Sequence, residues 1–181
     1  TYIGDGMYDV IIVGAGPAGL FAAYELCKNK NKNKNIKVLL IDQGKLAKNR
    51  VCPMNKNGIP CVNCNPCNIM SGYGGAGTFS DGKLNFVPKL GKSDLMKYMD
   101  LEVANQLIVD TEKIFNEFGM DSKIYPTNMD DALRIQKKVA LVGAKLMLIK
   151  QKHLGSDKLP TYIRSMTDYL IENGVTVLEN T

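Results

Sequence analysis

The segment Gly-Ala-Gly-Pro-Ala-Gly occupies residues 14–19, directly after a short apolar run at residues 10–13. Gly14 permits a tight turn out of a strand, Gly16 lets the backbone approach a pyrophosphate, and Gly19 lets a helix pack closely on a sheet. The first N–H groups of such a helix, and the positive end of its dipole, can hold phosphates. The spacing therefore predicts a strand, a turn and a helix that together cradle a dinucleotide.

An acidic residue, Asp42, ends a second apolar run at residues 37–41 and lies 23 residues after Gly19. An acid about 20 residues beyond the glycine turn can accept hydrogen bonds from a ribose hydroxyl. Because it is an acid, Asp42 argues against a cofactor with a 2′-phosphate, so NADP is not expected, whereas the spacing does not separate FAD from NAD. The alternating Lys/Asn tract at residues 28–35 accounts for the slightly long spacing and is predicted to be an exposed loop.

Four cysteines, Cys52, Cys61, Cys64 and Cys67, lie in a segment rich in proline and asparagine. Four thiolates suit a tetrahedral Zn site, and the C-x2-C-x2-C spacing is also typical of a [4Fe–4S] cluster. We expect a metal or cluster on these four residues. The alternatives are free or reversibly oxidised thiols and structural disulfides. The fifth cysteine, Cys27, falls on the apolar face of the first predicted helix and is expected to be a buried, inert thiol.

A second glycine-rich segment, residues 69–84, follows the cysteines at once. It has too many glycines for a strand or a stable helix. We expect it to form a second wall of the cofactor site, and a flexible loop is the alternative. The residues expected to contact the cofactor here are Gly74, Gly75, Ala76, Gly77, Thr78, Ser80, Asp81, Gly82 and Lys83.

The elements beyond residue 90 follow from apolar periodicity and capping residues. The pattern predicts a helix from a cap at Ser93 to Phe118, a helix at 130–142, a strand at 145–150, a turn at 153–157, a helix from a cap at Ser156 or Asp157 to Asn173, and a strand at 175–178.

Composition fits a globular chain with a core of its own, since 45% of its 181 residues are hydrophobic. The net charge is +5, but the basic residues are dispersed and are not interleaved with aromatic ones, which disfavours a nucleic-acid partner. No apolar run approaches the roughly 20 residues of a membrane span, and the N-terminus lacks the pattern of a signal peptide. We therefore expect a cytoplasmic protein with no membrane partner.

The chain as a whole resembles a family of bacterial FAD-dependent dehydrogenases, labelled FAD-dependent protein C or NAD(P)/FAD-dependent oxidoreductase. Three motifs carry the resemblance, namely YDVIIVGAGPAGL at 8–20, CVNCNPCNIMSGYGGAGTFSDGKLN at 61–85 and KHLGSDKLP at 152–160. The resemblance covers nearly all of residues 7–181. Pro17, within the glycine turn, also resembles FAD enzymes more than NAD dehydrogenases. Pro17, Ala18 and Gly19 are expected to contact the cofactor together with Gly14 and Gly16.

The resemblance implies an α/β fold with a Rossmann-like (βαβ), glutathione-reductase-like FAD domain. It places FAD contacts at Gly14, Gly16, Asp42 and the 74–83 segment. Relatives of this kind are more than twice as long, so the FAD domain here is expected to be incomplete. We expect residues 7–90 to form its N-terminal part, and 91–181 to start an α+β substrate domain and return to the FAD domain.

These expectations make the chain the N-terminal part of an FAD-dependent oxidoreductase with a small-molecule substrate and an electron acceptor. The missing C-terminal part of the same protein would be its partner, and the isolated chain is expected to bind FAD weakly or not at all. The alternatives are a non-catalytic nucleotide- or metal-binding module and a flavin-dependent RNA-modifying enzyme, which would need a basic surface bearing aromatic residues.

Two residues are candidates for a catalytic role. His153 is the single histidine, and it follows a predicted strand and precedes a predicted helix, where α/β folds place ligand groups. Lys83 lies in the glycine-rich segment, and a cation near a flavin stabilises the reduced, anionic ring. The plain alternatives are a structural histidine and an ordinary surface lysine.

Overall fold

The computed structural model describes residues 7–28, 36–155 and 157–181. The expected Lys/Asn loop therefore lies almost wholly outside the described residues, as does Ser156, an expected helix cap. The chain divides into two compact units, residues 1–80 with 156–181, and residues 81–155. The division differs from the boundary expected at residue 90, because the glycine-rich segment is split between the units at Ser80 and Asp81.

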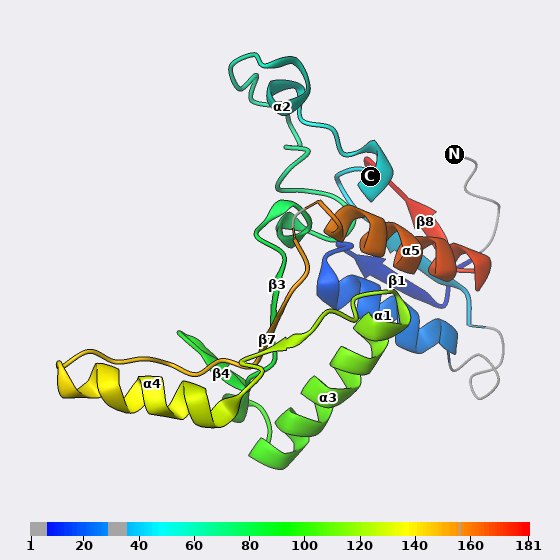
Figure 1. Cartoon of the computed structure of the whole chain (residues 1–181). Helices are drawn as coiled ribbons and strands as arrows, with labels where there is room; N and C mark the ends of the chain where they lie inside the picture. Colours follow the sequence, from blue (N-terminus) through cyan, green and yellow to red (C-terminus); the bar gives the residue numbers. More distant parts are fainter. Residues whose placement is uncertain (1–6, 29–35, 156) are drawn as a thin grey trace. The chain divides into compact units, whose positions relative to one another are not determined.

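The first unit contains a three-stranded parallel sheet with strand order β1-β2-β8 (Figure 1). Its strands are β1 (Val10–Val13), β2 (Val38–Ile41) and β8 (Thr176–Leu178). Val10 pairs with Val38, and Leu39 pairs with Thr176. Runs of Val, Ile and Leu suit such a sheet because parallel strands are normally buried. The three strands expected in this unit are confirmed.

Two helices, α1 (Pro17–Lys28) and α5 (Leu159–Glu172), pack beside each other on this sheet. The rings of Tyr24 and Tyr169 meet between them, with centroids 5.6 Å apart. Their apolar residues, which include Leu20, Ala23, Ile163, Met166 and Leu170, form the core of the unit. On the other face of β1, Ile11 and Val13 are 58% and 79% exposed, because successive strand residues point to opposite sides.

Three short helical segments interrupt the loops of the first unit. They are the 3-10 turns η1 (Ala47–Asn49) and η2 (Ala76–Phe79), and helix α2 (Pro53–Asn57), which starts directly after Cys52. The cysteine segment therefore has one helical turn that composition did not predict. Pro53 occupies the first helical position, where the missing N–H of proline is tolerated.

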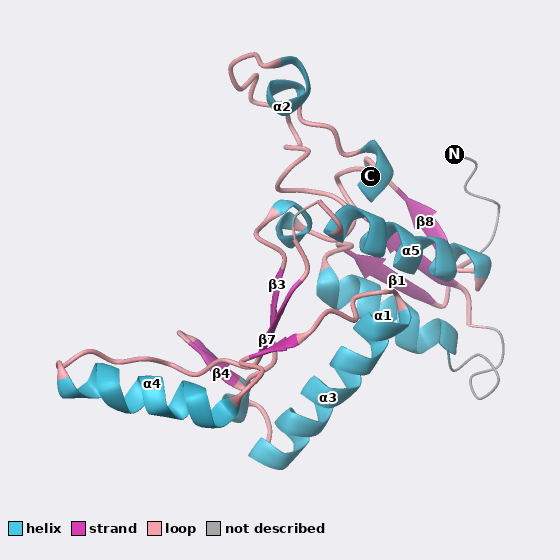
Figure 2. Cartoon of the chain, in the orientation of Figure 1, coloured by secondary structure: helices cyan, strands magenta, loops and turns pink. Residues whose placement is uncertain are grey.

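The second unit contains two small antiparallel sheets and two long helices (Figure 2). One sheet has the order β3-β7-β6 and the other pairs β4 with β5. The elements are β3 (Lys83–Asn85), β4 (Lys89–Leu90), β5 (Ser93–Asp94), η3 (Leu95–Lys97), α3 (Leu101–Glu117), β6 (Ile124–Tyr125), α4 (Met129–Leu141) and β7 (Gln151–His153).

Two expectations for the second unit are wrong. The strand expected at 145–150 is displaced to β7, because Lys152 pairs with both Leu84 and Ile124 and strand pairing decides the register. The first long helix starts at Leu101, because Ser93 belongs to β5 and the adjoining residues form η3.

The helix expected at 130–142 agrees with α4, whereas the cap expected at Asp157 for the last helix is wrong, because the N-cap of α5 is Lys158 and no side-chain hydrogen bond caps it. Helix α4 is capped by Asn128, whose side chain accepts hydrogen bonds from the N–H groups of Asp130 and Asp131. Helix α5 covers most of the span expected up to Asn173, and Asn173 is its C-cap. Among the described residues, no helix is both long enough and apolar enough to span a membrane.

Candidate functional site

The glycine turn connects β1 to α1 at the carboxyl end of the parallel sheet. Gly14 has a φ of +96°, a conformation that favours glycine, and its N–H donates to the carbonyl of Ile41 at 2.8 Å. A Cβ placed on Gly19 would overlap the carbonyl oxygen of Gly14, whereas a Cβ on Gly16 would meet nothing within 4 Å. Gly19 is therefore required for packing, and Gly16 borders open space that a phosphate can approach.

Asp42, at the end of β2, is bonded to the turn itself. One carboxylate oxygen accepts the N–H of Ala15 and the other accepts the N–H of Gly44, each at 2.8 Å. The residue is 9% exposed. A carboxylate has about four acceptor positions, so further hydrogen bonds to a ribose are chemically available. The ribose contact stays a prediction, and the observed role of Asp42 is to hold the turn against β2.

The first part of the glycine-rich segment docks on this turn. Gly74 donates its N–H to the carbonyl of Ala15 at 2.8 Å. A Cβ on Gly75 would lie 3.4 Å from the Cα of Gly16 and 3.5 Å from the Cδ of Pro17. The segment thus forms a second backbone wall beside the position where a phosphate would enter. Contact of residues 74–75 with a cofactor stays a prediction.

Arg50 holds that wall in place, and the sequence pattern gave no signal of this role. The residue is 4% exposed, and the Cζ of its guanidinium lies 4.8 Å from the ring centroid of Phe79. It donates over 2.6 to 3.3 Å to the carbonyls of Asn68, Ile69, Tyr73 and Gly75 and to the hydroxyl of Thr78. Burial lowers the pKa of Arg50, and the charges of Asp42 and Cys67 oppose that shift.

Tyr73 attaches the same wall to the sheet. Its ring is fully buried, and its hydroxyl lies 2.9 Å from the carbonyl oxygens of both Leu40 and Leu178, in β2 and β8. Burial raises the pKa of Tyr73 well above its ordinary value, and the charge of Asp42 adds to the shift. Both carbonyls belong to strands far away in sequence, so no local pattern could identify Tyr73.

Of the other residues expected in the glycine-rich segment, Ala76, Gly77 and Thr78 lie in η2 and Ser80 is its C-cap, all in the first unit, and their contact with a cofactor stays a prediction. Asp81, Gly82, Lys83 and His153 belong to the second unit. Asp81 and Lys83 form an exposed ion pair of 2.9 Å, and Lys83 lies opposite His153 in the pairing of β3 with β7. The hydrogen bond from Lys83 lowers the pKa of Asp81. A Cβ on Gly82 would run into the backbone of Gly155. His153 is the last residue of β7, so it does not begin the turn that was expected there. The ammonium of Lys83 already pairs with the carboxylate of Asp81.

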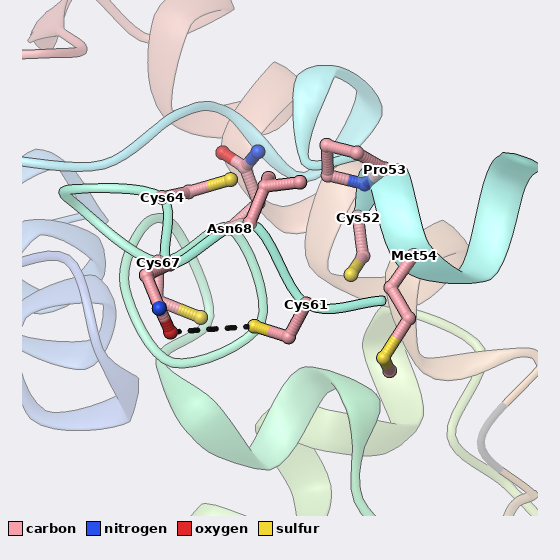
Figure 3. Close-up of a pocket in the computed structure, with 9 residues that line it drawn as sticks. Cys52, Pro53, Met54, Cys61, Cys64, Cys67 and Asn68 are labelled. Carbon is pink, nitrogen blue, oxygen red and sulfur yellow. Dashed lines mark hydrogen bonds between the residues drawn. The ribbon is translucent and has the colours of Figure 1, made fainter. Parts of the chain in front are cut away.

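The four grouped cysteines line one pocket of the first unit (Figure 3). The pocket has a volume of about 220 Å³, and its other lining residues are Pro53, Met54, Val62, Asn63 and Asn68. We call it the cysteine pocket. All five cysteines of the chain are described, and none is in a disulfide. Across the described ranges, no three Cys, His, Asp or Glu side chains form a group able to hold a metal ion.

The expected metal or cluster site on these four cysteines is therefore not shown by the described residues. The four side chains reach the same pocket but do not surround one centre. Cys67 differs from the others, because hydrogen bonds from the backbone N–H groups of Met70 and Ile69 lower the pKa of its thiol, with a smaller contribution from Arg50. Cys27 is buried as expected, and its thiol donates to the carbonyl of Tyr24 at 3.2 Å.

The match to known families falls on the glycine turn and on Asp42. A family model described as an NAD(P)-binding Rossmann-like domain matches residues 12–46. The domain built on this turn is Rossmann-like. This assignment agrees with the parallel order β1-β2-β8 and with the α/β fold expected from the sequence.

Relatives of known sequence or structure are matched only over part of their length. An uncharacterized protein of Methanosarcina barkeri is 49% identical over 45 residues, which are 25% of this chain and 10% of that protein. The structure of THI4 from Thermovibrio ammonificans is 17% identical, with a TM-score of 0.40 over 95% of this chain and 38% of that chain. L-amino acid deaminase from Proteus vulgaris is 13% identical, with a TM-score of 0.42 over 96% of this chain and 40% of that chain. The chain thus spans less than half the length of each.

Proposed function

We propose that this chain is part of an FAD-dependent oxidoreductase and that its Rossmann-like domain binds the adenosine and pyrophosphate part of FAD. The observation that carries the proposal is the open space at Gly16, which faces the wall formed by Gly74 and Gly75. Backbone can approach a pyrophosphate closely only where no Cβ intervenes. The first N–H groups of α1 have no partner within the helix and supply donors at the same place.

The choice of FAD over NAD rests on the second wall and on the resemblance. A glycine-rich segment bonded to the turn adds backbone beyond the first βαβ unit, as the motif GGAGTFSDGKL of the FAD-dependent family suggests. FAD, when bound, supplies a ring that accepts a hydride or single electrons from a substrate. The chain's own residues hold its pyrophosphate at Gly14–Gly19 and fix the turn through Asp42. A small-molecule substrate and an electron acceptor complete the proposed reaction.

The experiment is a titration of the isotope-labelled chain, followed by the NMR shifts of backbone amides. FAD and ADP are both expected to shift the amides of residues 14–19 and of Gly74 and Gly75. Riboflavin lacks the adenosine and pyrophosphate, so it should leave these amides unchanged. Amide shifts report weak binding as well as tight binding. The proposal is wrong if neither FAD nor ADP moves these amides at millimolar concentration.

A matched pair of variants separates binding from folding. In Gly16→Val, the added side chain fills the space where a phosphate would approach, so the FAD-dependent shifts should disappear. Gly143→Asn is the control, because Gly143 belongs to the second unit, has a φ of +75° that asparagine tolerates, and borders open space. Its titration should match the parent chain. A site selective for NAD⁺, with no response to FAD, would also contradict the proposal.

A further inference from the structure

A groove lies in the second unit between helix α4 and the segment that follows it. Gly143, with a φ of +75°, turns the chain after α4, and residues 144–150 run back beside the helix (Figure 1). The side-chain amide of Gln136 donates to the carbonyl of Leu146 at 2.8 Å and joins the two stretches. The groove has a volume of about 350 Å³, within the roughly 300–1,000 Å³ of small-molecule sites. It is therefore large enough for a small organic molecule.

Half of the residues that line this groove are apolar. We call it the α4 groove, and its lining residues are Gln136, Lys137, Ala140, Ala144, Lys145 and Leu146. Apolar surface continues beside it, because Leu141 and Val142, at the end of α4, are 87% and 81% exposed. Covering exposed apolar surface with the hydrocarbon part of a ligand is favourable in water. The groove therefore suits a ligand with an apolar part.

Two ammonium groups of the groove have no partner of their own. Lys137 and Lys145 are exposed, and neither forms an ion pair or a hydrogen bond within the part of the chain that the structure describes. Residues 132–150 contain one arginine and four lysines but no aspartate or glutamate. The positive charge of both lysines is therefore available to an anionic ligand.

We propose that the α4 groove binds an organic anion with a hydrocarbon chain, of the class of the long-chain carboxylates. The ammonium groups of Lys137 and Lys145 hold the carboxylate. The chain lies against the apolar side chains of Ala140, Ala144 and Leu146. The ligand binds as a single dissolved molecule, because the two lysines line a hollow with the volume of a small-molecule site. The groove belongs wholly to the second unit, so this proposal does not depend on the binding of FAD.

The experiment titrates the isotope-labelled chain with dodecanoate, below the concentration at which it forms micelles, and follows the backbone amides by NMR. We expect shifts centred on residues 136–146. In a series from hexanoate to dodecanoate, affinity should rise at least about twofold for each added CH₂, since a fully buried CH₂ contributes about fourfold. Dodecyltrimethylammonium has the same chain but the opposite charge, so it should bind at least about tenfold more weakly than dodecanoate.

Single substitutions test the two lysines against a matched control. Lys137→Gln and Lys145→Gln should each weaken the binding of dodecanoate about fivefold, which is the effect of one charge pair about 4 Å apart in water. Lys138→Gln should bind like the parent chain, because Lys138 is also an exposed lysine of α4 but does not line the groove. Ala144→Phe fills the groove with an aromatic ring and should abolish binding. Circular dichroism checks that each variant is folded.

Three results would overturn the proposal. The first is an affinity that does not change with chain length, and the second is a loss in Lys138→Gln as large as in Lys137→Gln and Lys145→Gln. The third is a response of the 136–146 amides to phosphatidylglycerol vesicles but not to dissolved dodecanoate, which would make α4 a docking surface for an anionic membrane. None of these results bears on the amides of the glycine turn, so the test succeeds or fails separately from the titration with FAD.

Discussion

The carboxylate of Asp42 accepts a hydrogen bond from the backbone N–H of Ala15 at 2.8 Å, which joins the end of β2 to the middle of the glycine turn. The other oxygen of the carboxylate accepts the N–H of Gly44 at the same distance. Both donors are buried with the side chain. An acid expected from its position to bind ribose is thus also a structural part of the turn, and removing it affects the fold as well as the ligand.

Replacing Asp42 with alanine tests this structural role. Asp42→Ala leaves two buried N–H groups without their acceptor, and we expect the free energy of unfolding to fall by about 2 kcal/mol. Urea unfolding followed by circular dichroism measures the loss. The control is Asp168→Ala, which removes an exposed ion pair with Arg164 and should cost less than about 1 kcal/mol. Equal losses in the two variants would show that Asp42 contributes little to the fold.

Gly16 and Gly19 should differ in how much stability the chain loses when each is replaced by alanine. In Gly19→Ala, the new Cβ overlaps the carbonyl oxygen of Gly14, so the helix must shift and stability should fall by about 2 kcal/mol. In Gly16→Ala, the new Cβ enters open space, and stability should change by less than about 0.5 kcal/mol. Thermal unfolding of both variants measures the difference. Similar melting temperatures would mean that α1 packs on the turn differently from the contact described here.

The parts of the site that could be predicted are those with a local signal. The glycine spacing, the apolar runs of β1 and β2 and the acid at position 42 lie within about 35 residues of one another, and they yielded a strand, turn, helix and strand in the correct order. These features need no knowledge of the rest of the chain, because turns and amphipathic periods are set by neighbouring residues.

The parts that could not be predicted depend on long-range contacts. The hydroxyl of Tyr73 meets the carbonyl of Leu178, which is 105 residues away in sequence. Arg50 is charged, so its residue type alone suggests a surface position. Its five hydrogen-bond acceptors, four carbonyls and the hydroxyl of Thr78, come together only in the folded chain. The strand was expected at 145–150, but the structure has β7 at 151–153, because pairing with β3 and β6 determines its position and no local pattern shows that pairing. Cysteine spacing predicted a metal or cluster centre, but among the described residues the four cysteines only line a common pocket, because the spacing does not fix the directions of their sulfurs.

Arg50 should be intolerant even of a change that keeps its charge. In Arg50→Lys, a single ammonium replaces the planar fork that reaches several carbonyls, so acceptors in the 68–78 segment lose their donor. We expect a loss of about 3 kcal/mol in the free energy of unfolding, since hydrogen bonds from charged groups contribute more than neutral ones. Arg164→Lys is the matched control, because Arg164 is exposed and pairs only loosely with Asp168 at 3.4 Å. A cost for Arg50→Lys as small as for Arg164→Lys would contradict the role assigned to Arg50.

The free energy of unfolding of the second unit should depend on pH through the carboxyl group of Glu112. Its carboxylate lies 3.2 Å from the ammonium groups of both Lys150 and Lys152, and the side chain of Lys152 is only 4% exposed. Burial raises the pKa of Glu112, but the hydrogen bonds from the two lysines outweigh it, so the net pKa is lowered. Since the folded pKa lies below the unfolded value of about 4.3, the stabilisation is present above that pH and is lost as the pH falls through the folded pKa.

The variant Glu112→Gln removes this dependence and also leaves the buried ammonium of Lys152 without its carboxylate. At neutral pH we expect it to lower the free energy of unfolding by about 2 kcal/mol. Below the folded pKa of Glu112, the parent chain has lost the same charge, so the two unfolding curves should converge. Glu102→Gln, at the exposed start of α3, is the control and should keep the acid dependence of the parent. If the difference between Glu112→Gln and the parent stays constant as the pH is lowered, the lysines do not stabilise the charged form of Glu112, and this account of the second unit is wrong.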